Sequence, residues 1–251
     1  MTLSPRERTG AEPSGRPLLL HNMTAAESAV DGPMGGAVAM LGKRFEMRSL
    51  PDSWTADDLK SARLVWLNST GRPTRGAGGS PDGSGFPQAV LRYVEDGGVL
   101  WIMLGDPKRP NTVRSLLMPL GIVQGERRTA PKRLRIPQSN PLAGGMLWIT
   151  GGLTPMDIEE SPGLLNPVMV PNDLSQPPVA PQAADFAGIA MVWGGLGKGR
   201  IAVFGDTEWL EKKAWDDPTG STPGTALRSN GQFLDRWIEW ALKPAAPAGA
   251  P

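Results

Sequence analysis

Five polar residues in this 251-residue chain have side chains that could perform chemistry and positions that would bring them together. Asn68 and Ser69 follow one apolar run, Asp106 follows a second, and Asp206 and Glu208 follow a third. If these runs are parallel strands, the residues after them gather at the carboxyl edge of the sheet, where doubly wound α/β proteins bind ligands. Two or three carboxylates there could hold Mg²⁺ or Ca²⁺, or act as the acid and base of glycoside hydrolysis.

Each of these residues also has a structural explanation, which we favour. An Asp that follows a strand-ending Gly often caps a turn or a helix, as Asp106 and Asp206 would. Asn68, Ser69 and Thr70 have no neighbouring His or Lys to activate them, which favours a turn or capping role. They also match a glycosylation sequon, which is relevant only to a secreted eukaryotic chain. We therefore predict no catalytic residue, and the three carboxylates would be catalytic only in an enzyme.

Composition excludes several classes of site and partner. The chain has no Cys and a single His, so thiolate metal sites, poly-His zinc sites and a Cys nucleophile are absent. That residue, His21, lies in an apolar run and is interpreted as a core histidine. We expect no metal and no cofactor. With 26 Lys and Arg against 25 Asp and Glu, the charge of +1 indicates no nucleic-acid partner, and the basic residues at 127–135 are interpreted as a solvated loop.

No apolar run approaches the roughly 18 residues that a membrane span requires. Residues 1–8 lack the apolar segment of a signal peptide. We therefore expect a soluble, by default cytoplasmic, chain, with membrane association through a partner left open. The abundance of Arg, Ala, Gly and Pro indicates a high-GC bacterial source.

The first half of the chain alternates predicted strands with predicted helices. Thr55 is the expected cap of one helix, Pro87 the expected first residue of another, and Gly42 the expected end of a third. The predicted strands are 17–21, 45–49, 63–67 and 99–104, and the helical segments lie around 38–41, 55–59 and 87–96. This alternation predicts a doubly wound, mostly parallel, flavodoxin-like α/β sheet.

The second half is less regular. Residues 125–185 are rich in Pro and Gly and are predicted to be an irregular, β-rich insertion with short strands at 147–149 and 168–170. The glycine-rich segment 194–199 is interpreted as the turn of a hairpin between 187–193 and 200–204. A last helix should begin at Asn230 and stop at Pro244. We expect one α/β domain over 17–243, between disordered tails at 1–16 and 244–251.

Nine Trp against one Tyr is an unusual balance. The predicted elements bury Trp66, Trp101 and Trp237 in the core. In contrast, three others are expected to be partly exposed near the carboxyl edge or on the last helix, where Trp favours sugar stacking or a protein interface: Trp209, Trp215 and Trp240.

Two segments carry a family resemblance. Residues 197–206 read Gly-Lys-Gly-Arg-Ile-Ala-Val-Phe-Gly-Asp, and residues 229–233 read Ser-Asn-Gly-Gln-Phe. With the strand and turn at 97–106, they resemble the class I glutamine-amidotransferase-like superfamily. The resemblance is to its non-catalytic branches: the ThuA-like proteins, the gliding-motility and ABC-transporter auxiliary domains, and a related domain of an intraflagellar-transport protein. It covers most of 17–243.

The resemblance implies that both reacting groups of the amidotransferases are missing. Where those enzymes have Gly-Ile-Cys-Leu-Gly, residues 101–105 place Met103 at the nucleophile's position, and their His-Pro-Glu falls on Asp206-Thr207-Glu208. No glutaminase activity is expected. We predict a non-enzymatic binding or assembly module, which recognises a protein partner or a small polar ligand at the strand ends. The alternative is a hydrolase acting on carbohydrate, possible only if the carboxylates converge. The family also implies a transporter-associated or surface role.

Overall fold

Strands and helices alternate through the described part of the chain in a computed structural model. The described residues are 15–51, 54–72, 85–105, 108, 112–125, 133–135, 148–150, 156–158, 165–169, 189–211 and 225–243. In the first half the elements are β1 (Leu18–His21), α1 (Ala25–Ser28), α2 (Gly35–Arg44), β2 (Glu46–Ser49), α3 (Ala56–Lys60), β3 (Ala62–Asn68), α4 (Gly85–Glu95) and β4 (Val99–Met103). Each strand that we predicted here is found, within one residue at either end.

The second half adds a short helical segment, several short strands, a hairpin and a long helix. These are α5 (Arg114–Leu117), η1 (Met118–Leu120), β5 (Ile122–Gln124), β6 (Arg133–Arg135), β7 (Trp148–Thr150), β8 (Met156–Ile158), β9 (Leu165–Met169), β10 (Ile189–Leu196), β11 (Gly199–Phe204), η3 (Glu208–Leu210) and α7 (Thr225–Leu242). The tails predicted at 1–16 and 244–251 lie almost entirely outside the described residues, as does most of the insertion at 125–185.

One sheet contains all of these strands except β6 and β7, which pair with each other. Its order is β2-β1-β3-β4-β11-β10-β8-β5, with β9 also paired to β10. Strands β2, β1, β3, β4 and β11 run parallel, and the strands beyond β11 pair antiparallel. The fold is therefore doubly wound α/β with a mostly parallel sheet, as predicted.

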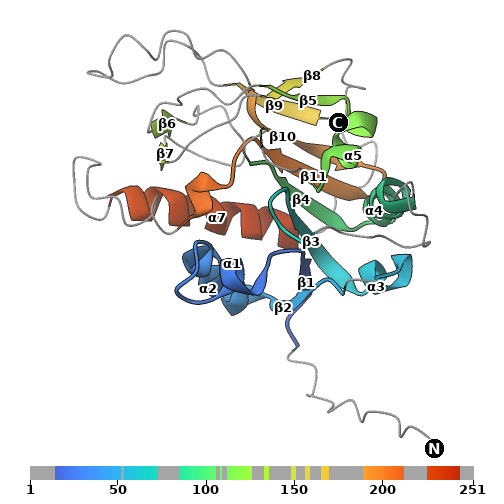
Figure 1. The fold of residues 1–251 in the computed structure, drawn as a ribbon, viewed down its shortest axis with the longest axis horizontal. Coiled ribbons are helices and arrows are strands. Elements are labelled where there is room, and N and C mark those ends of the chain that lie inside the picture. The colour runs from blue at the N-terminus through green and yellow to red at the C-terminus, as the bar shows by residue number, and fades with distance from the viewer. Residues whose placement is uncertain are drawn as a thin grey trace, which may run out of the picture.

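Helices cover both faces of this sheet, which explains why its central strands are continuous apolar runs. Figure 1 shows α2 and α7 on one side of the sheet and α3, α4 and α5 on the other. Successive strand residues alternate between the two cores: Leu64 and Trp66 face the α2/α7 side, whereas Val65 and Leu67 face the α3/α4/α5 side.

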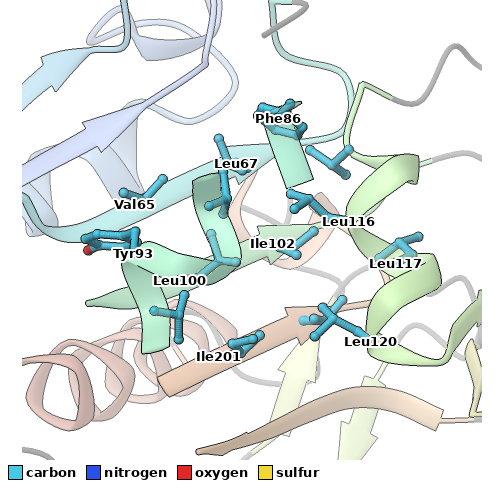
Figure 2. Close-up of a cluster of buried hydrophobic side chains, with 14 of the residues drawn as sticks. Val65, Leu67, Phe86, Tyr93, Leu100, Ile102, Leu116, Leu117, Leu120 and Ile201 are labelled. Carbon is cyan, nitrogen blue, oxygen red and sulfur yellow. The ribbon is translucent and has the colours of Figure 1, made fainter. Parts of the chain in front are cut away.

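The core on the α3/α4/α5 side is mostly aliphatic, and the Tyr93 hydroxyl forms hydrogen bonds within it. Figure 2 shows Tyr93 beside Val65 and Leu100, with Leu116 and Leu117 of α5 at the other end of the cluster, beyond Ile102. The Tyr93 hydroxyl accepts the Val99 N–H at 3.2 Å and lies 3.3 Å from the Ala62 carbonyl oxygen, so it joins the starts of β3 and β4. A Cβ at Gly98 would lie 2.2 Å from the Tyr93 ring, so only glycine fits there. Burial raises the pKa of Tyr93.

The core on the α2/α7 side is aromatic. Trp237 on α7 makes edge contacts with Phe204 at 5.0 Å, Trp240 at 5.1 Å, Phe233 at 5.9 Å and Trp193 at 6.1 Å between ring centroids. These rings fix α7 on the sheet.

Burial matches the prediction for most of the tryptophans that the structure describes. Trp66, Trp101 and Trp237 are fully buried and Trp240 is half-buried, as expected. Trp209 is also buried, so the prediction of partial exposure was wrong: it packs against Phe204 and Phe233. Trp215 lies outside the described residues.

Local signals predicted some helix ends and missed others. Thr55 caps α3 as predicted, in a reciprocal capping box with Asp58. Gly42 does not end α2, which continues to Arg44: a Cβ at Gly42 would meet nothing within 4 Å, so the glycine lies on an open surface where the helix tolerates it. Pro87 is the third residue of α4 rather than its first, still within the turn whose N–H groups need no intrahelical partner.

The last helix begins at Thr225, so Asn230 is not its cap. The Asn230 side chain is buried and donates a hydrogen bond from Nδ2 to the Trp209 carbonyl at 2.8 Å. A tertiary contact with the segment after β11 therefore explains this Asn, not helix initiation. Pro244 lies outside the described residues.

The predicted hairpin is present. β10 and β11 pair antiparallel, and the two residues between them are Gly197, with a φ of 60°, and Lys198. The solvated loop predicted at 127–135 was wrong for its last three residues, because 133–135 form β6 and pair with β7. No described helix is both long and apolar enough to span a bilayer.

Two arginines hold the carboxyl end of α7. Arg63, at the start of β3, donates to the carbonyls of Ala241 at 3.1 Å, Leu242 at 3.4 Å and Lys243 at 2.6 Å. Arg200, at the start of β11, donates to the Trp240 carbonyl at 2.6 Å and lies over its ring. Cations at this end of a helix satisfy unpaired carbonyls and oppose the negative end of the helix dipole.

We predict that Arg63→Ala lowers the free energy of unfolding by about 1–3 kcal/mol, because three carbonyls of the last turn lose a charged donor. Arg63→Lys should recover part of this loss, since it keeps the charge without the forked geometry. Urea denaturation measures the difference. The control is Arg92→Ala, at an exposed position of α4, with an expected change within about 0.5 kcal/mol. Equal effects of the two alanine variants would contradict this role.

Candidate functional site

The carboxyl ends of the parallel strands form the candidate site. In the order β2-β1-β3-β4-β11, the chain connection from β1 passes over the α2 face and the connection from β3 passes over the α4 face. The two connections diverge between β1 and β3, and a crevice between such strands is where flavodoxin-like folds bind ligands. The residues after His21 and Asn68 therefore decide whether this crevice is open.

The side chain of Asn22, the residue after β1, forms a bridge to the last residue of β3. Asn22 accepts the Asn68 N–H on Oδ1 at 2.6 Å and donates from Nδ2 to the Asn68 carbonyl at 2.9 Å. Its carboxamide thus imitates the two bonds that another strand residue would make. Asn22 and Asn68 are both almost completely buried. Asn22 therefore extends the pairing of β1 and β3 by one residue and ties their carboxyl ends together.

The loop after β3 is fitted closely around Asn22. The Asn22 carbonyl accepts the Arg72 N–H at 2.8 Å, and Asn22 Nδ2 lies 3.3 Å from the Arg72 carbonyl oxygen. A Cβ at Gly71 would lie 2.7 Å from the Asn22 carboxamide, so glycine is required by close approach. Arg72 also donates to the Leu50 carbonyl at 2.8 Å, which joins this loop to the residue after β2.

A carboxylate links the loops after β1 and β3. Glu27 accepts the Thr24 N–H at 2.8 Å, in a capping box at the start of α1. Its other oxygen lies 3.1 Å from the Thr70 hydroxyl. Thr70 in turn lies 3.1 Å from Asn68 Oδ1. This carboxylate therefore has a structural role and is engaged on both oxygens.

The two predicted polar residues after β3 are buried. Asn68 has no exposed surface and Ser69 is 3% exposed, so neither presents its side chain to solvent and Asn68 is not an accessible glycan acceptor. Thr112 donates to their carbonyls at 3.2 Å and 3.1 Å, which fastens the segment before α5 to this loop. Asn68 Nδ2 has no hydrogen-bond partner among the described residues.

His21 is a core residue, as interpreted from its apolar surroundings. It is 5% exposed, and burial, with a smaller contribution from the Arg72 guanidinium, lowers its pKa to about 4. It is therefore neutral near pH 7. Its Nδ1 is buried without a hydrogen-bond partner in the part of the chain that the structure describes.

Met103, at the position that the resemblance assigns to a nucleophile, is the last residue of β4 and is fully buried in the α2/α7 core. The next turn is packed equally closely. A Cβ at Gly105 would lie 3.0 Å from Ser69 Oγ, and the Gly105 carbonyl accepts the Gln124 side chain at 2.6 Å. This turn therefore belongs to the packed interior.

The carboxylates after β11 lie on one short turn. Asp206 is 2% exposed, and its Oδ1 accepts the Glu208 N–H at 3.0 Å, which is the turn-capping role that we favoured. Glu208 is half-buried at the start of η3. Asp106 lies outside the described residues.

The structure brings some of the five candidates together but not all. Asn68 and Ser69 lie at the end of β3, whereas Asp206 and Glu208 follow β11, and β4 lies between these strands. Adjacent strands are about 4.8 Å apart, so the two pairs are separated by roughly 10 Å. Among the described residues, no group of three or more His, Asp or Glu side chains could hold a metal ion.

The sequence analysis missed the residues that tie the loops of this edge together. The Thr24-x-x-Glu27 spacing is a capping-box signature and could have located the start of α1. Asn22, Gly71 and Thr112 carry no such signal, because their partners are 40 or more residues away along the chain.

We predict that Asn22→Ala lowers the free energy of unfolding by about 1–3 kcal/mol, because the buried Asn68 N–H loses its acceptor, whereas the Asn68 carbonyl keeps the Gly71 N–H and the Thr112 hydroxyl. Asn22→Asp should be as damaging near pH 7, since a carboxylate cannot donate to the Asn68 carbonyl. Chemical denaturation measures both. Gln88→Ala removes an exposed carboxamide from α4 and is the control. A loss no larger than that of the control would show that the bridge is unimportant.

The lowered pKa of His21 makes the free energy of unfolding depend on pH. Because its pKa falls from 6.5 in the unfolded chain to about 4 in the folded one, its neutral form stabilises the fold fully above pH 6.5. Between pH 6.5 and 4 the unfolded chain binds the extra proton, so this stabilisation is lost as the pH falls. From pH 7 to 5, wild type should lose about 2 kcal/mol more than His21→Gln. Parallel pH profiles of the two proteins would contradict this.

Comparisons with known proteins identify the fold and no family. No family model and no curated protein matches the chain. The mmIFT52 N-terminal domain is similar over 91% of this chain and 99% of that chain, with a TM-score of 0.63 and 13% identity. The cytoplasmic protein STM3548 from Salmonella typhimurium is similar over 91% and 98%, with a TM-score of 0.56 and 13% identity.

A third similar structure is an enzyme, the exo-beta-1,4-mannosidase Op5Man5 from Opitutaceae bacterium strain TAV5. The likeness covers 91% of this chain but only 36% of the mannosidase, with a TM-score of 0.50 and 12% identity. At these identities the three likenesses show a shared α/β fold and nothing about activity or partners.

Proposed function

We propose that this chain is a non-enzymatic module that binds or assembles with a protein partner through the carboxyl edge of its sheet. The observation that carries the proposal is the buried Asn22 bridge to Asn68, which engages the polar groups at the ends of β1 and β3, beside the place where this fold binds small ligands. The neighbouring polar groups of Glu27, Thr70 and Thr112 are also engaged with one another or with the backbone.

The same edge offers apolar groups to a partner. Val30, in the connection between α1 and α2, is 91% exposed. Met118 is 85% exposed. It comes directly after α5, and the segment before α5 is joined to the loop after β3 by Thr112. These two apolar side chains lie on opposite sides of the sheet, and each could take part in a protein contact beside the internally bonded polar edge.

The family proposal agrees with this role. We assign the chain to the non-catalytic branches of the class I glutamine-amidotransferase-like superfamily, on the motifs at 97–106, 197–210 and 229–242. Met103 and Asp206 replace the nucleophile and the base of the enzymes, and Met103 cannot form a thiolate. A transporter-associated role remains a proposal that rests on this assignment alone.

The alternative, a carbohydrate hydrolase, depends on carboxylates that flank a bound sugar. Asp206 and Glu208 lie two residues apart on one turn, so they do not face each other across a sugar. Asp206 also accepts the Glu208 N–H and caps this turn. The alternative therefore requires Asp106 as a partner across an open cleft.

A ligand and activity screen separates the two functions. We expect no rise in the melting temperature of wild type with Mg²⁺, Ca²⁺, mono- and oligosaccharides or nucleotides, and no hydrolysis of aryl glycosides above background. Glu208→Gln, at a half-buried position, and Asp206→Asn serve as matched variants. A saturable rise in melting temperature, or turnover that either variant abolishes, would favour the hydrolase.

The protein partner is tested by placing a photo-crosslinking amino acid at position 30 or 118 in the native host. We expect one crosslinked product at these two positions, displaced by excess purified wild type. Arg92, exposed on α4 toward the amino edge, is the control position and should not give it. The same products at all three positions, or none at 30 and 118, would contradict binding at the carboxyl edge.

A further inference from the structure

Strand β2 ends the sheet and has backbone groups that face away from it. Figure 1 shows β2 at the margin beyond β1, and among the described residues β1 is its only strand partner. Glu46 N–H donates to the Pro17 carbonyl at 3.0 Å and Leu50 N–H donates to the His21 carbonyl at 2.7 Å, so the even-numbered residues are directed toward β1. By the period of two in a strand, the N–H and C=O groups of Met47 and Ser49 point outward, as does the C=O of Phe45, whereas the Phe45 N–H donates to the Leu41 carbonyl of α2 at 2.8 Å.

The charges on β2 have a self-complementary arrangement. Glu46 and Arg48 lie on the same face, with Met47 between them, and Arg48 Nε donates to Glu46 Oε1 at 2.7 Å. The Arg48 side chain is 61% exposed and the Glu46 side chain 28% exposed. If a second β2 runs antiparallel with Met47 opposite Met47, each Glu46 lies opposite the other copy's Arg48.

We propose that β2 pairs with β2 of a second copy of this chain, in an antiparallel register centred on Met47. In this register the outward groups of Met47 form a hydrogen-bonded pair, and at both ends the Ser49 N–H of one copy donates to the Phe45 carbonyl of the other. The contact is isologous, as two-fold symmetry requires, and joins the two sheets into one.

The neighbouring antiparallel registers are disfavoured by charge or by backbone direction. A register centred on Glu46 places two glutamates opposite each other and sets Arg44 against Arg48, and one centred on Arg48 places two arginines opposite each other. A shift that pairs Met47 with Arg48 sets an outward residue against an inward one, so the ladder bonds cannot form. Charges on an edge strand normally prevent pairing, and here they favour the register centred on Met47 over the registers next to it.

This inference uses the β2 backbone rather than the loops at the carboxyl edge, so it is independent of the proposed function. It also predicts where engineered cysteines can form a disulfide between the two copies. The two Met47 residues are a hydrogen-bonded antiparallel pair, whose Cα atoms lie about 5.5 Å apart, a distance that fits a disulfide. The two Ser49 residues are offset by four residues along the strands, which separates them by roughly 13 Å.

The chain has no Cys, so single-cysteine variants have no background. Under mild oxidation we expect Met47→Cys to form a disulfide-linked dimer, and Ser49→Cys, at a more exposed position, to do so at least roughly tenfold more slowly. Cross-linking of Ser49→Cys as fast as Met47→Cys would overturn the register.

Charge variants test the pairing without changing Met47. By analytical ultracentrifugation we expect wild type to dimerise reversibly, and Glu46→Arg and Arg48→Glu each to dimerise at least roughly tenfold more weakly, because like charges then face each other. An equimolar mixture of the two variants restores both opposite pairs and should regain the dimer. Glu95→Arg, exposed on α4, makes the same change of charge as Glu46→Arg and should dimerise as wild type does. A monomeric wild type at all concentrations, or a mixture no better than its components, would overturn the proposal.

Discussion

The carboxamide of Asn22 is the interaction on which the carboxyl edge of the sheet depends. It pairs with both backbone groups of Asn68, and Gly71 and Arg72 fold closely around it. A parallel sheet opens where neighbouring connections leave on opposite faces, and here that opening contains a buried side chain. The polar residues of this edge hold loops together, which is why we propose binding of a protein surface rather than chemistry on a small ligand.

The rest of the fold fastens α7 to the sheet. Trp237 and its aromatic neighbours fix α7 on one face, and Arg63 with Arg200 holds the carboxyl end of that helix at the opposite edge of the sheet. The Trp-rich composition therefore serves packing in most of the positions that the structure describes. Trp240 is the half-buried exception, beneath the Arg200 guanidinium.

Patterns that depend on neighbouring residues were predictable from the sequence. The apolar runs of β1, β3 and β4, the Thr55 cap and the β10–β11 hairpin all follow from local periodicity or turn chemistry. Features decided by distant contacts were not. Asn230 has the residue type of a helix cap but binds the Trp209 carbonyl, and Gly42 resembles a helix end but lies on an open helix surface. For the candidate site, the sequence predicted that its polar residues follow the carboxyl ends of the strands. It did not predict that Asn68 and Ser69 are buried, or that Thr112 binds their carbonyls.

The most direct test of the account is amide hydrogen exchange of Asn68, measured by NMR. Its N–H donates to the Asn22 side chain, just where β3 ends and a loop begins. If the bridge closes the edge permanently, this amide should exchange only through global unfolding, with a protection equal to that of the buried β3 amides. Exchange as fast as that of exposed loop amides would show that the edge opens, and would contradict a closed, non-catalytic site.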